Sequence, residues 1–100
     1  FWAGPVATSI LGALGADVVK IESIQRPDGM RFAGGIRRPE VFEFSPVTHA
    51  VIVGKRDLTL DVNQPEGLAL AKRMIEWADL VVENFAPRVM ENFGLGWDVV

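Results

Sequence analysis

The sequence predicts an α/β fold in which helices flank a parallel sheet. Helix-like and strand-like segments alternate along its 100 residues, and the runs GADVVKIE and WADLVVEN each place an apolar strand directly after a predicted helix. Helix–strand units in series favour parallel strands, because parallel strands need crossover connections. Right-handed crossovers would stack these units into a partial Rossmann-like sheet.

The first half of the chain contains one predicted helix and one predicted strand. Residues 5–14 are expected to be helical, because Pro5 suits the first turn and Gly15 can end the helix. The apolar residues of this helix fall on one face and are Val6, Ile10, Leu11 and Leu14. Residues 17–22 form a short run rich in β-branched side chains, which favours a strand. Residues 23–45 are rich in Gly, Pro and Arg and are expected to form a long loop, and loops of this length are usually functional or mobile.

Two further strands are predicted in the second half. Residues 58–62 alternate between apolar and polar types, and residues 80–83 form a short apolar run after a helix. Residues 47–53 stay open between a strand and a helix. Their β-branched content favours a strand, but the run is too short for periodicity to decide.

Two helices accompany these strands. The longer one is expected over residues 65–77, with Asn63 and Glu66 as a capping box. Its core-facing stripe would consist of Leu68, Ala71, Ile75 and Ala78. A shorter helix is expected over residues 87–94, where a proline can start it and a glycine can end it.

The composition restricts the classes of function. A hydrophobic content of 49% with 23% charged residues is typical of a globular protein, and the net charge of −3 argues against a nucleic-acid-binding surface. The absence of cysteine excludes disulfides and thiol catalysis. The apolar stretches are far shorter than the roughly 20 residues of a membrane span, and we see no signal peptide, so a cytoplasmic protein without membrane contact is expected.

Both ends of the sequence predict a piece of a larger protein. The chain begins at Phe1 without an initiator methionine, and it stops at Val100, where a new apolar segment starts. We therefore expect residues 1–100 to be a fragment. Its sheet would lack its first strand, the one that should precede Phe1.

A candidate binding site follows from the expected sheet, because ligands of open parallel sheets bind beyond the carboxyl ends of the strands. The predicted strands end at residues 22–23, 61–63 and 84–86, and the expected first strand would exit at Trp2. Helices start beside these exits, and free backbone N–H groups at helix starts favour anions. A phosphate-bearing ligand is therefore expected here, with Trp2 or Phe85 offering an apolar surface. The alternative is that these aromatic side chains only fill the edge of the sheet.

Basic side chains are candidate phosphate partners at the same edge. They are Arg31, Arg37, Arg38, Lys55 and Arg56. For Arg37 and Arg38, a solvated loop surface is an equally good interpretation. His49 is the only histidine, and we expect it to be a surface or packed residue rather than a metal ligand or a base. No Ser/His/Asp set and no acid pair is recognisable, so the residues favour binding over catalysis.

Two long stretches of the chain resemble one protein family. The runs AGPVATSILGALGADVVKIE and GKRDLTLDVNQPEGLALAKRMIEWADLVVENFAPRVMENFGLGWD are similar, in this order, to the N-terminal region of class III CoA-transferases, the CaiB/BaiF family. The similarity covers nearly all of the chain apart from residues 30–50. It implies an enzyme that moves CoA from an acyl-CoA to a carboxylic acid, with residues 1–100 as part of its Rossmann-like CoA-binding domain.

The resemblance also implies how the full-length protein works. In this family an aspartate attacks the thioester and gives an acyl–enzyme anhydride, after which CoA passes to the acceptor acid. That aspartate would lie beyond Val100, so no catalytic residue is assigned in this chain. CoA and acyl-CoA would be substrates rather than tightly bound cofactors, and two full-length chains would interlock as a homodimer.

The CoA contacts that the resemblance implies fall on three loops. They are Trp2, Ala3, Leu60, Asp61, Val62, Asn63, Asn84, Phe85 and Ala86. Two arginines of the family pattern are replaced by Ser23 and Asn92, and Arg26 or Arg31 is a candidate to take the place of the first. For residues 47–53, the resemblance favours a short helix.

Two alternative functions stay open. A racemase that acts on α-methylacyl-CoA resembles the same family, and it would also carry its acid and base outside these residues. A non-catalytic nucleotide-binding or structural module is the second alternative. Binding loops filled by their own side chains would favour that alternative.

Overall fold

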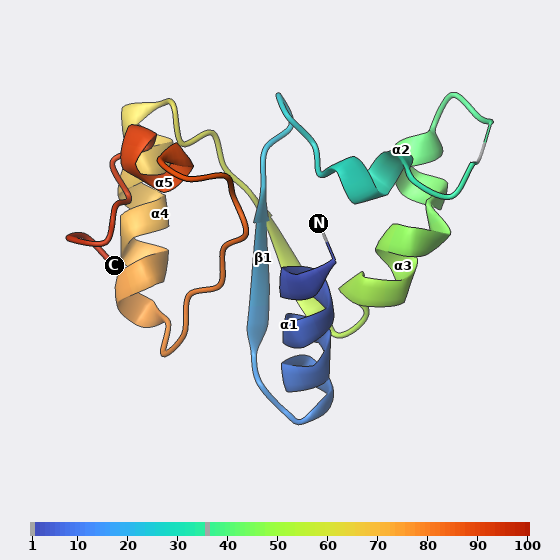
Figure 1. The fold of residues 1–100 in the computed structure, drawn as a ribbon, viewed down its shortest axis with the longest axis horizontal. Coiled ribbons are helices and arrows are strands. Elements are labelled where there is room, and N and C mark those ends of the chain that lie inside the picture. The colour runs from blue at the N-terminus through green and yellow to red at the C-terminus, as the bar shows by residue number, and fades with distance from the viewer. Residues whose placement is uncertain (1, 36) are drawn as a thin grey trace.

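Two parallel strands lie at the centre of the molecule, with helices to both sides. The computed structural model describes residues 2–35 and 37–100. Strand β1 (Val18–Glu22) pairs with strand β2 (Lys55–Thr59), and Val18 lies opposite Lys55. The helices are α1 (Ala3–Ala13), the 3₁₀ helix η1 (Gly29–Phe32), α2 (Val41–Phe44), α3 (Pro46–Ile52), α4 (Pro65–Trp77) and α5 (Val89–Asn92). Figure 1 shows α4 and α5 to one side of the strands and α2 and α3 to the other, which confirms the α/β fold class.

The crossover between the strands contains helical turns where the sequence predicted one long loop over residues 23–45. η1 begins where the carboxylate of Asp28 accepts a hydrogen bond from the backbone N–H of Met30 at 3.0 Å. α3 begins where the hydroxyl of Ser45 accepts one from the N–H of Thr48 at 3.3 Å. Such caps stabilise short helices without any periodic apolar pattern, and within residues 23–45 the helices η1 and α2 interrupt the predicted loop. The short helix that the resemblance favoured is confirmed by α3.

Strand β2 lies three residues earlier than predicted. The alternating run 58–62 placed it too late, because the backbone already turns at Gly54, where φ is 77°, and Lys55 then starts the ladder. After the strand, the carboxylate of Asp61 accepts the backbone N–H of Asn63 at 3.0 Å. This side-chain turn competes with the ladder and ends the strand.

The predicted strand over residues 80–83 is wrong for the part of the chain that the structure describes. The sheet there consists of β1 and β2 alone, and a strand persists only where a neighbour takes up its backbone hydrogen bonds. The segment lies against α1 instead. A methyl group built on Gly4 would be 3.6 Å from Cγ1 of Val82, so the first turn of α1 and this segment are in contact.

The hydrophobic core lies between β2, α4 and α5. Leu60, Ala71 and Leu95 are buried together. The side chains packed against them are Leu58, Val62, Leu68, Ile75, Met90 and Phe93. The predicted helix over residues 65–77 is confirmed by α4, and its stripe contributes the buried Ala71 with its two packed neighbours on the helix.

The start of α4 differs from the predicted capping box. Its N-cap is Gln64, in extended backbone. Asn63 is engaged by Asp61 instead, whose carboxylate accepts from its backbone N–H at 3.0 Å and from its side-chain amide at 3.1 Å. Gly67 lies directly over this turn, because a methyl group there would be 2.7 Å from the carbonyl carbon of Asp61. α4 and the exit of β2 are therefore in direct backbone contact.

Helix α1 begins at Ala3, two residues before its predicted start. Its expected apolar face is uncovered within the described residues, since Ile10 and Leu14 are 57% and 80% exposed. Polar contacts attach the helix on its other side. Nζ of Lys55, at the start of β2, donates to the carbonyl of Pro5 at 2.8 Å.

The short helix predicted over residues 87–94 is found as α5, inside those bounds. The turn before it holds Arg88 in the left-handed region, at φ 69°. Among residues 2–35 and 37–100, no helix is long and apolar enough to cross a membrane.

Candidate binding site at the carboxyl ends of the strands

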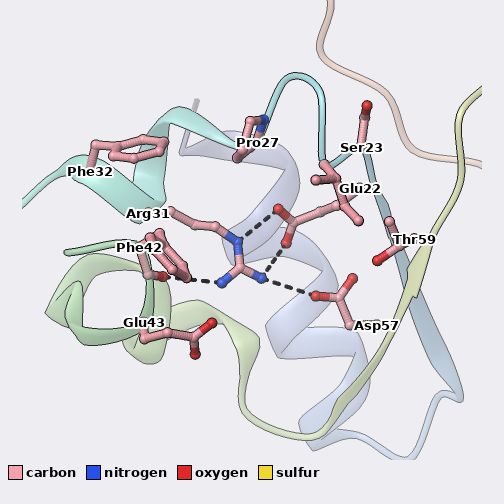
Figure 2. A pocket seen from close by; sticks show the side chains of 10 residues that line it. Glu22, Ser23, Pro27, Arg31, Phe32, Phe42, Glu43, Asp57 and Thr59 are labelled. Atoms are coloured by element: carbon pink, nitrogen blue, oxygen red, sulfur yellow. Dashed lines mark hydrogen bonds and ion pairs between the residues drawn. The ribbon is translucent and has the colours of Figure 1, made fainter. Parts of the chain in front are cut away.

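One arginine joins both strands to the crossover, at the last residue of β1 and at the middle residue of β2. Nε and Nη2 of Arg31, on η1, each donate to one carboxylate oxygen of Glu22, the last residue of β1, at 2.8 Å. Nη2 also donates to Oδ2 of Asp57 on β2 at 3.1 Å, and Nη1 donates to the carbonyl of Phe42 at 3.2 Å. Figure 2 shows the guanidinium between these groups.

The carboxylate of Glu22 is the electrostatic centre of this cluster. Its burial would raise its pKa, but hydrogen bonds from Arg31 and Lys20, together with their positive charges, lower that pKa to about 2. Asp57 responds in the opposite direction, because burial and the negative charge of Glu22 raise its pKa. Lys20 pairs with Glu22 and also with Asp28, at 3.3 Å from Oδ2. The cluster is therefore built around one carboxylate that stays ionised.

A pocket of about 360 Å³ lies beside the cluster (Figure 2). It is lined by Glu22, Ser23, Ile24, Pro27, Arg31, Phe32, Phe42, Glu43, Asp57 and Thr59. The strand ends and the crossover form its walls together. Thr59, the last residue of β2, lines it and directly precedes the predicted contact loop at residues 60–63. The edge of the sheet at which the sequence predicted ligand binding is therefore hollowed.

The candidate phosphate partners are distributed differently from the prediction. Arg31 is at the carboxyl edge, but carboxylates already occupy its guanidinium. Lys55 and Arg56 begin β2 and so lie at its opposite, amino end. There Nε of Arg56 donates to Oδ1 of Asp17 at 3.0 Å, and a second contact joins its Nη2 to Oδ2. The prediction that these two residues line the carboxyl edge is therefore wrong, because the register starts the strand with them.

The other basic candidates and His49 lie at the surface. Arg37 and Arg38 are exposed, as the alternative interpretation had it, and the guanidinium carbon of Arg38 is 5.0 Å from the ring centroid of Phe44. His49 is exposed as well, with Nε2 2.6 Å from the carbonyl oxygen of Glu43. Among the described residues, no group of three or more His, Cys, Asp or Glu side chains could hold a metal ion.

The first predicted contact loop is the start of α1. Trp2 is the N-cap of the helix and is 50% exposed, and Ala3 is its first residue. The contact between Gly4 and Val82 brings this loop next to the segment that leads into the third predicted loop.

The second loop follows β2. Leu60 is buried in the core, and its backbone N–H donates to the carbonyl of Glu22 at 2.9 Å, so its side chain and its N–H are both engaged within the protein. Asp61 and Val62 are half-buried, and Asn63 is exposed. The turn that Asp61 and Asn63 share fixes the shape of this loop.

The third loop, Asn84, Phe85 and Ala86, is exposed. The backbone N–H of Phe85 donates to Oε2 of Glu83 at 2.7 Å. Its ring is 58% exposed and meets the ring of Phe93 edge-on, with centroids 6.2 Å apart. Because Phe93 packs against the core that contains Leu60, the third loop is joined to the second through one aromatic pair.

The comparisons with known proteins agree on a family. The model of CoA-transferase family III matches residues 1–100. This chain belongs to CoA-transferase family III. The resemblance read from the sequence is therefore confirmed.

Proteins named as CoA-transferases align along almost the whole length of this chain. It is 39% identical over 98 residues to succinyl-CoA–D-citramalate CoA-transferase of Chloroflexus aurantiacus, covering 98% of this chain and 24% of that protein. It is 33% identical over 99 residues to formyl-CoA:oxalate CoA-transferase of Afipia carboxidovorans, covering 95% of this chain and 22% of that protein. The chain thus spans about a quarter of the length of the curated relatives it matches.

Solved structures share the fold of this family III chain. A CaiB/BaiF family protein from Brucella suis superimposes with a TM-score of 0.82 and 34% sequence identity. The superposition covers 97% of this chain and 26% of that one. The arrangement of β1, β2 and the surrounding helices is therefore the arrangement of a known CaiB/BaiF structure.

The sequence prediction for this family III chain missed the role of Glu22 and Asp57. The signal for Glu22 was present, since Lys20 and Glu22 alternate onto one face of β1 and a charged pair on a strand end is unusual in a core. Asp57 could not be assigned to the cluster from the sequence, because that requires the pairing register of β1 and β2, which places Lys20 opposite Asp57. Sequence reasoning placed Arg31 at the correct edge but gave it a phosphate as its partner instead of two carboxylates.

Proposed function

We propose that this chain is the N-terminal, CoA-binding part of an acyl-CoA:carboxylate CoA-transferase. The observation that carries the proposal is the alignment of relatives named as CoA-transferases along 95–100% of the chain. The alpha subunit of succinyl-CoA–L-malate CoA-transferase of Chloroflexus aurantiacus aligns with all of it, so that alignment includes the three predicted contact loops. Those relatives are named for transfer between CoA thioesters and carboxylic acids, so transfer is preferred over racemisation. The acyl donor would be a CoA thioester and the acceptor a carboxylic acid.

CoA would lie across the carboxyl ends of the strands and contact all three loops. The contacts we propose are Trp2, Ala3, Leu60, Asp61, Val62, Asn63, Asn84, Phe85 and Ala86. Leu60 would contribute its backbone, because its side chain is buried. The Phe85 ring offers an apolar surface, and the Asn84 amide can both donate and accept hydrogen bonds. In the first turn of α4, Pro65 has no N–H, so the backbone N–H groups of Glu66 and Gly67 are the ones that would favour a phosphate there.

The chemical step would use an aspartate outside this chain. Its carboxylate attacks the thioester carbonyl, the carbon–sulfur bond breaks, an acyl–aspartyl anhydride forms and CoA leaves as the thiolate. In the interval before the acceptor acid takes up CoA, the detached thiolate must stay in place. Holding CoA during that interval is the task we propose for the three loops, because a positioned reactant returns far faster than one from solution.

The test replaces Asn84 and Phe85 by alanine in the full-length transferase. Losing one polar contact and most of an aromatic surface should weaken CoA binding by about 1–3 kcal/mol, or roughly 5- to 150-fold. Isothermal titration measures the affinity, and a thermal melt beside it measures stability, which should change little because the loop is exposed. Phe44→Ala is the matched control, since Phe44 is a similarly exposed ring on α2. Unchanged affinity with a large fall in melting temperature would mean that the two residues are structural.

A further inference from the structure

The crossover between β1 and β2 is attached to the sheet by a cluster of ion pairs and hydrogen bonds centred on Glu22. Within the crossover, Ser45 fastens η1 to α3, because its hydroxyl donates to the carbonyl of Met30 at 2.6 Å. The polar contacts that reach the end of β1 converge on Glu22, which accepts from Arg31 and from the backbone N–H of Asp28, at 3.4 Å. Met30 of η1 is buried, but the pocket-lining rings Phe32 and Phe42 are exposed, so the wall of the pocket itself is held mainly by polar contacts.

Arg31 connects three elements of the fold to η1: β1, β2 and α2. One guanidinium holds Glu22 on β1, Asp57 on β2 and the carbonyl of Phe42 at α2. The planar fork of an arginine can satisfy these acceptors in one fixed geometry, which a lysine cannot. The pocket walls formed by the crossover therefore take their position from Glu22 on β1 and Asp57 on β2.

Arg31 is not arranged to bind a phosphate itself. Nε, Nη1 and Nη2 all have protein acceptors already. The cluster holds more negative than positive charges. Its cations are Arg31 and Lys20, and its carboxylates are those of Glu22, Asp28, Glu43 and Asp57. An anion placed here would meet net negative charge, so the cluster has the character of a support and not of a phosphate site.

We propose that Arg31 is a positioning residue for CoA binding. By joining the end of β1 and the middle of β2 to the crossover, it holds the pocket wall at Ser23, Pro27 and Phe42 in place beside the loop at residues 60–63. Thr59 lines this pocket and leads directly into that loop, so a displaced wall changes the surface next to residues 60–63. The inference rests on the proposed function of that loop, and it adds a residue that supports the site from behind without contacting CoA.

The experiment compares three substitutions in the full-length transferase. Arg31→Met removes all four hydrogen bonds, and Arg31→Lys keeps the charge but not the fork. Arg56→Met is the matched control, because it breaks a second two-point arginine–carboxylate pair, the exposed pair with Asp17 at the amino end of β2. CoA affinity is measured by titration, the split between KM and kcat by steady-state kinetics, and local opening by hydrogen exchange.

The expected pattern separates positioning from general stability. Arg31→Met should weaken CoA binding roughly ten- to a hundredfold, raise KM more than it lowers kcat, and increase amide exchange in residues 23–32 but not in α4. Arg31→Lys should lie between Arg31→Met and the wild type, and Arg56→Met should match the wild type. The loss should be the same for CoA and for 3′-dephospho-CoA, because Arg31 does not contact the phosphate.

Several results would overturn the inference. Wild-type CoA affinity in Arg31→Met would do so, as would a loss restricted to CoA that is absent for 3′-dephospho-CoA. If Arg31→Met does not fold, Asp57→Asn decides. Asp57→Asn weakens one bond at the partly exposed side of the cluster and should still reduce CoA affinity severalfold with increased exchange in residues 23–32. A wild-type protein that binds no CoA would refute the proposed function itself, which is a separate outcome.

Discussion

Replacing Gly67 by alanine should destabilise the protein, although alanine is the better helix former. Gly67 lies in the first turn of α4, directly over the backbone turn that ends β2. An added methyl group would be 2.7 Å from the carbonyl carbon of Asp61 and closer still to its oxygen. Neither side can yield by rotating a side chain, because both are backbone.

The size of the effect follows from two opposing contributions. A non-bonded carbon normally keeps about 3.3 Å from a carbonyl oxygen, so α4 or the loop must move by roughly 1 Å. Overpacking of this kind costs about 1–3 kcal/mol, and the constraint here favours the upper end. Alanine returns up to about 1 kcal/mol of helix propensity. We expect a net loss of about 2 kcal/mol in the free energy of unfolding, and weaker CoA binding, because the shifted loop is residues 61–63.

The assay is urea unfolding of the full-length protein followed by circular dichroism. The control is Gly12→Ala in the last turn of α1, where the same methyl group would meet Cγ2 of Val18 at an ordinary 3.7 Å. That variant should be neutral or stabilised by up to about 1 kcal/mol. Equal stabilisation by both substitutions would refute the argument, since it would show that the space above Asp61 is open.

Two further predictions concern the stability of the protein at low pH and the behaviour of residues 1–100 expressed alone. Because the pKa of Glu22 falls to about 2 in the folded state, its stabilising contribution is complete above about pH 4.5 and is lost as the pH drops toward 2. Thermal melts across this range should show a loss of about 2 kcal/mol in the free energy of unfolding, less than the full pKa shift of Glu22 corresponds to, because the pKa of Asp57 is shifted in the opposite direction. Glu22→Gln should flatten this dependence of stability on pH. An unchanged dependence in Glu22→Gln would contradict the ion-pair account. Expressed alone, residues 1–100 should self-associate, as measured by light scattering, because each described strand has an edge without a partner strand. They should also transfer no CoA. A stable monomer at high concentration would contradict the first expectation, and turnover above background would contradict the second.

The helices that carry their own local signals were the elements that the sequence predicted well. α4 has a proline in its first turn and an apolar stripe, and both act within the helix itself. β1 was predicted to within one residue because its run is short and β-branched. The position of β2 depends on its pairing with β1, and pairing is a property of two segments that a single alternating run does not reveal.

The candidate site divides in the same way. That loops gather at the carboxyl ends of parallel strands is a general property of such sheets, so the edge itself could be predicted. The partners of Arg31 could not, because Glu22 and Asp57 are 9 and 26 residues from it in the sequence. The exposed face of α1 marks the same limit, since its apolar stripe predicts burial without saying by what.

The cluster around Arg31 also bears on how the chain assembles. Parallel pairing of β1 with β2 requires the whole crossover to close, and contacts between distant residues form slowly because chain entropy is lost before any contact repays it. Arg31 meets Glu22, Phe42 and Asp57 at separations of 9, 11 and 26 residues. Each contact leaves a shorter loop for the next one to close. The folding chain can therefore bring its two strands together through a series of nearer encounters centred on one side chain.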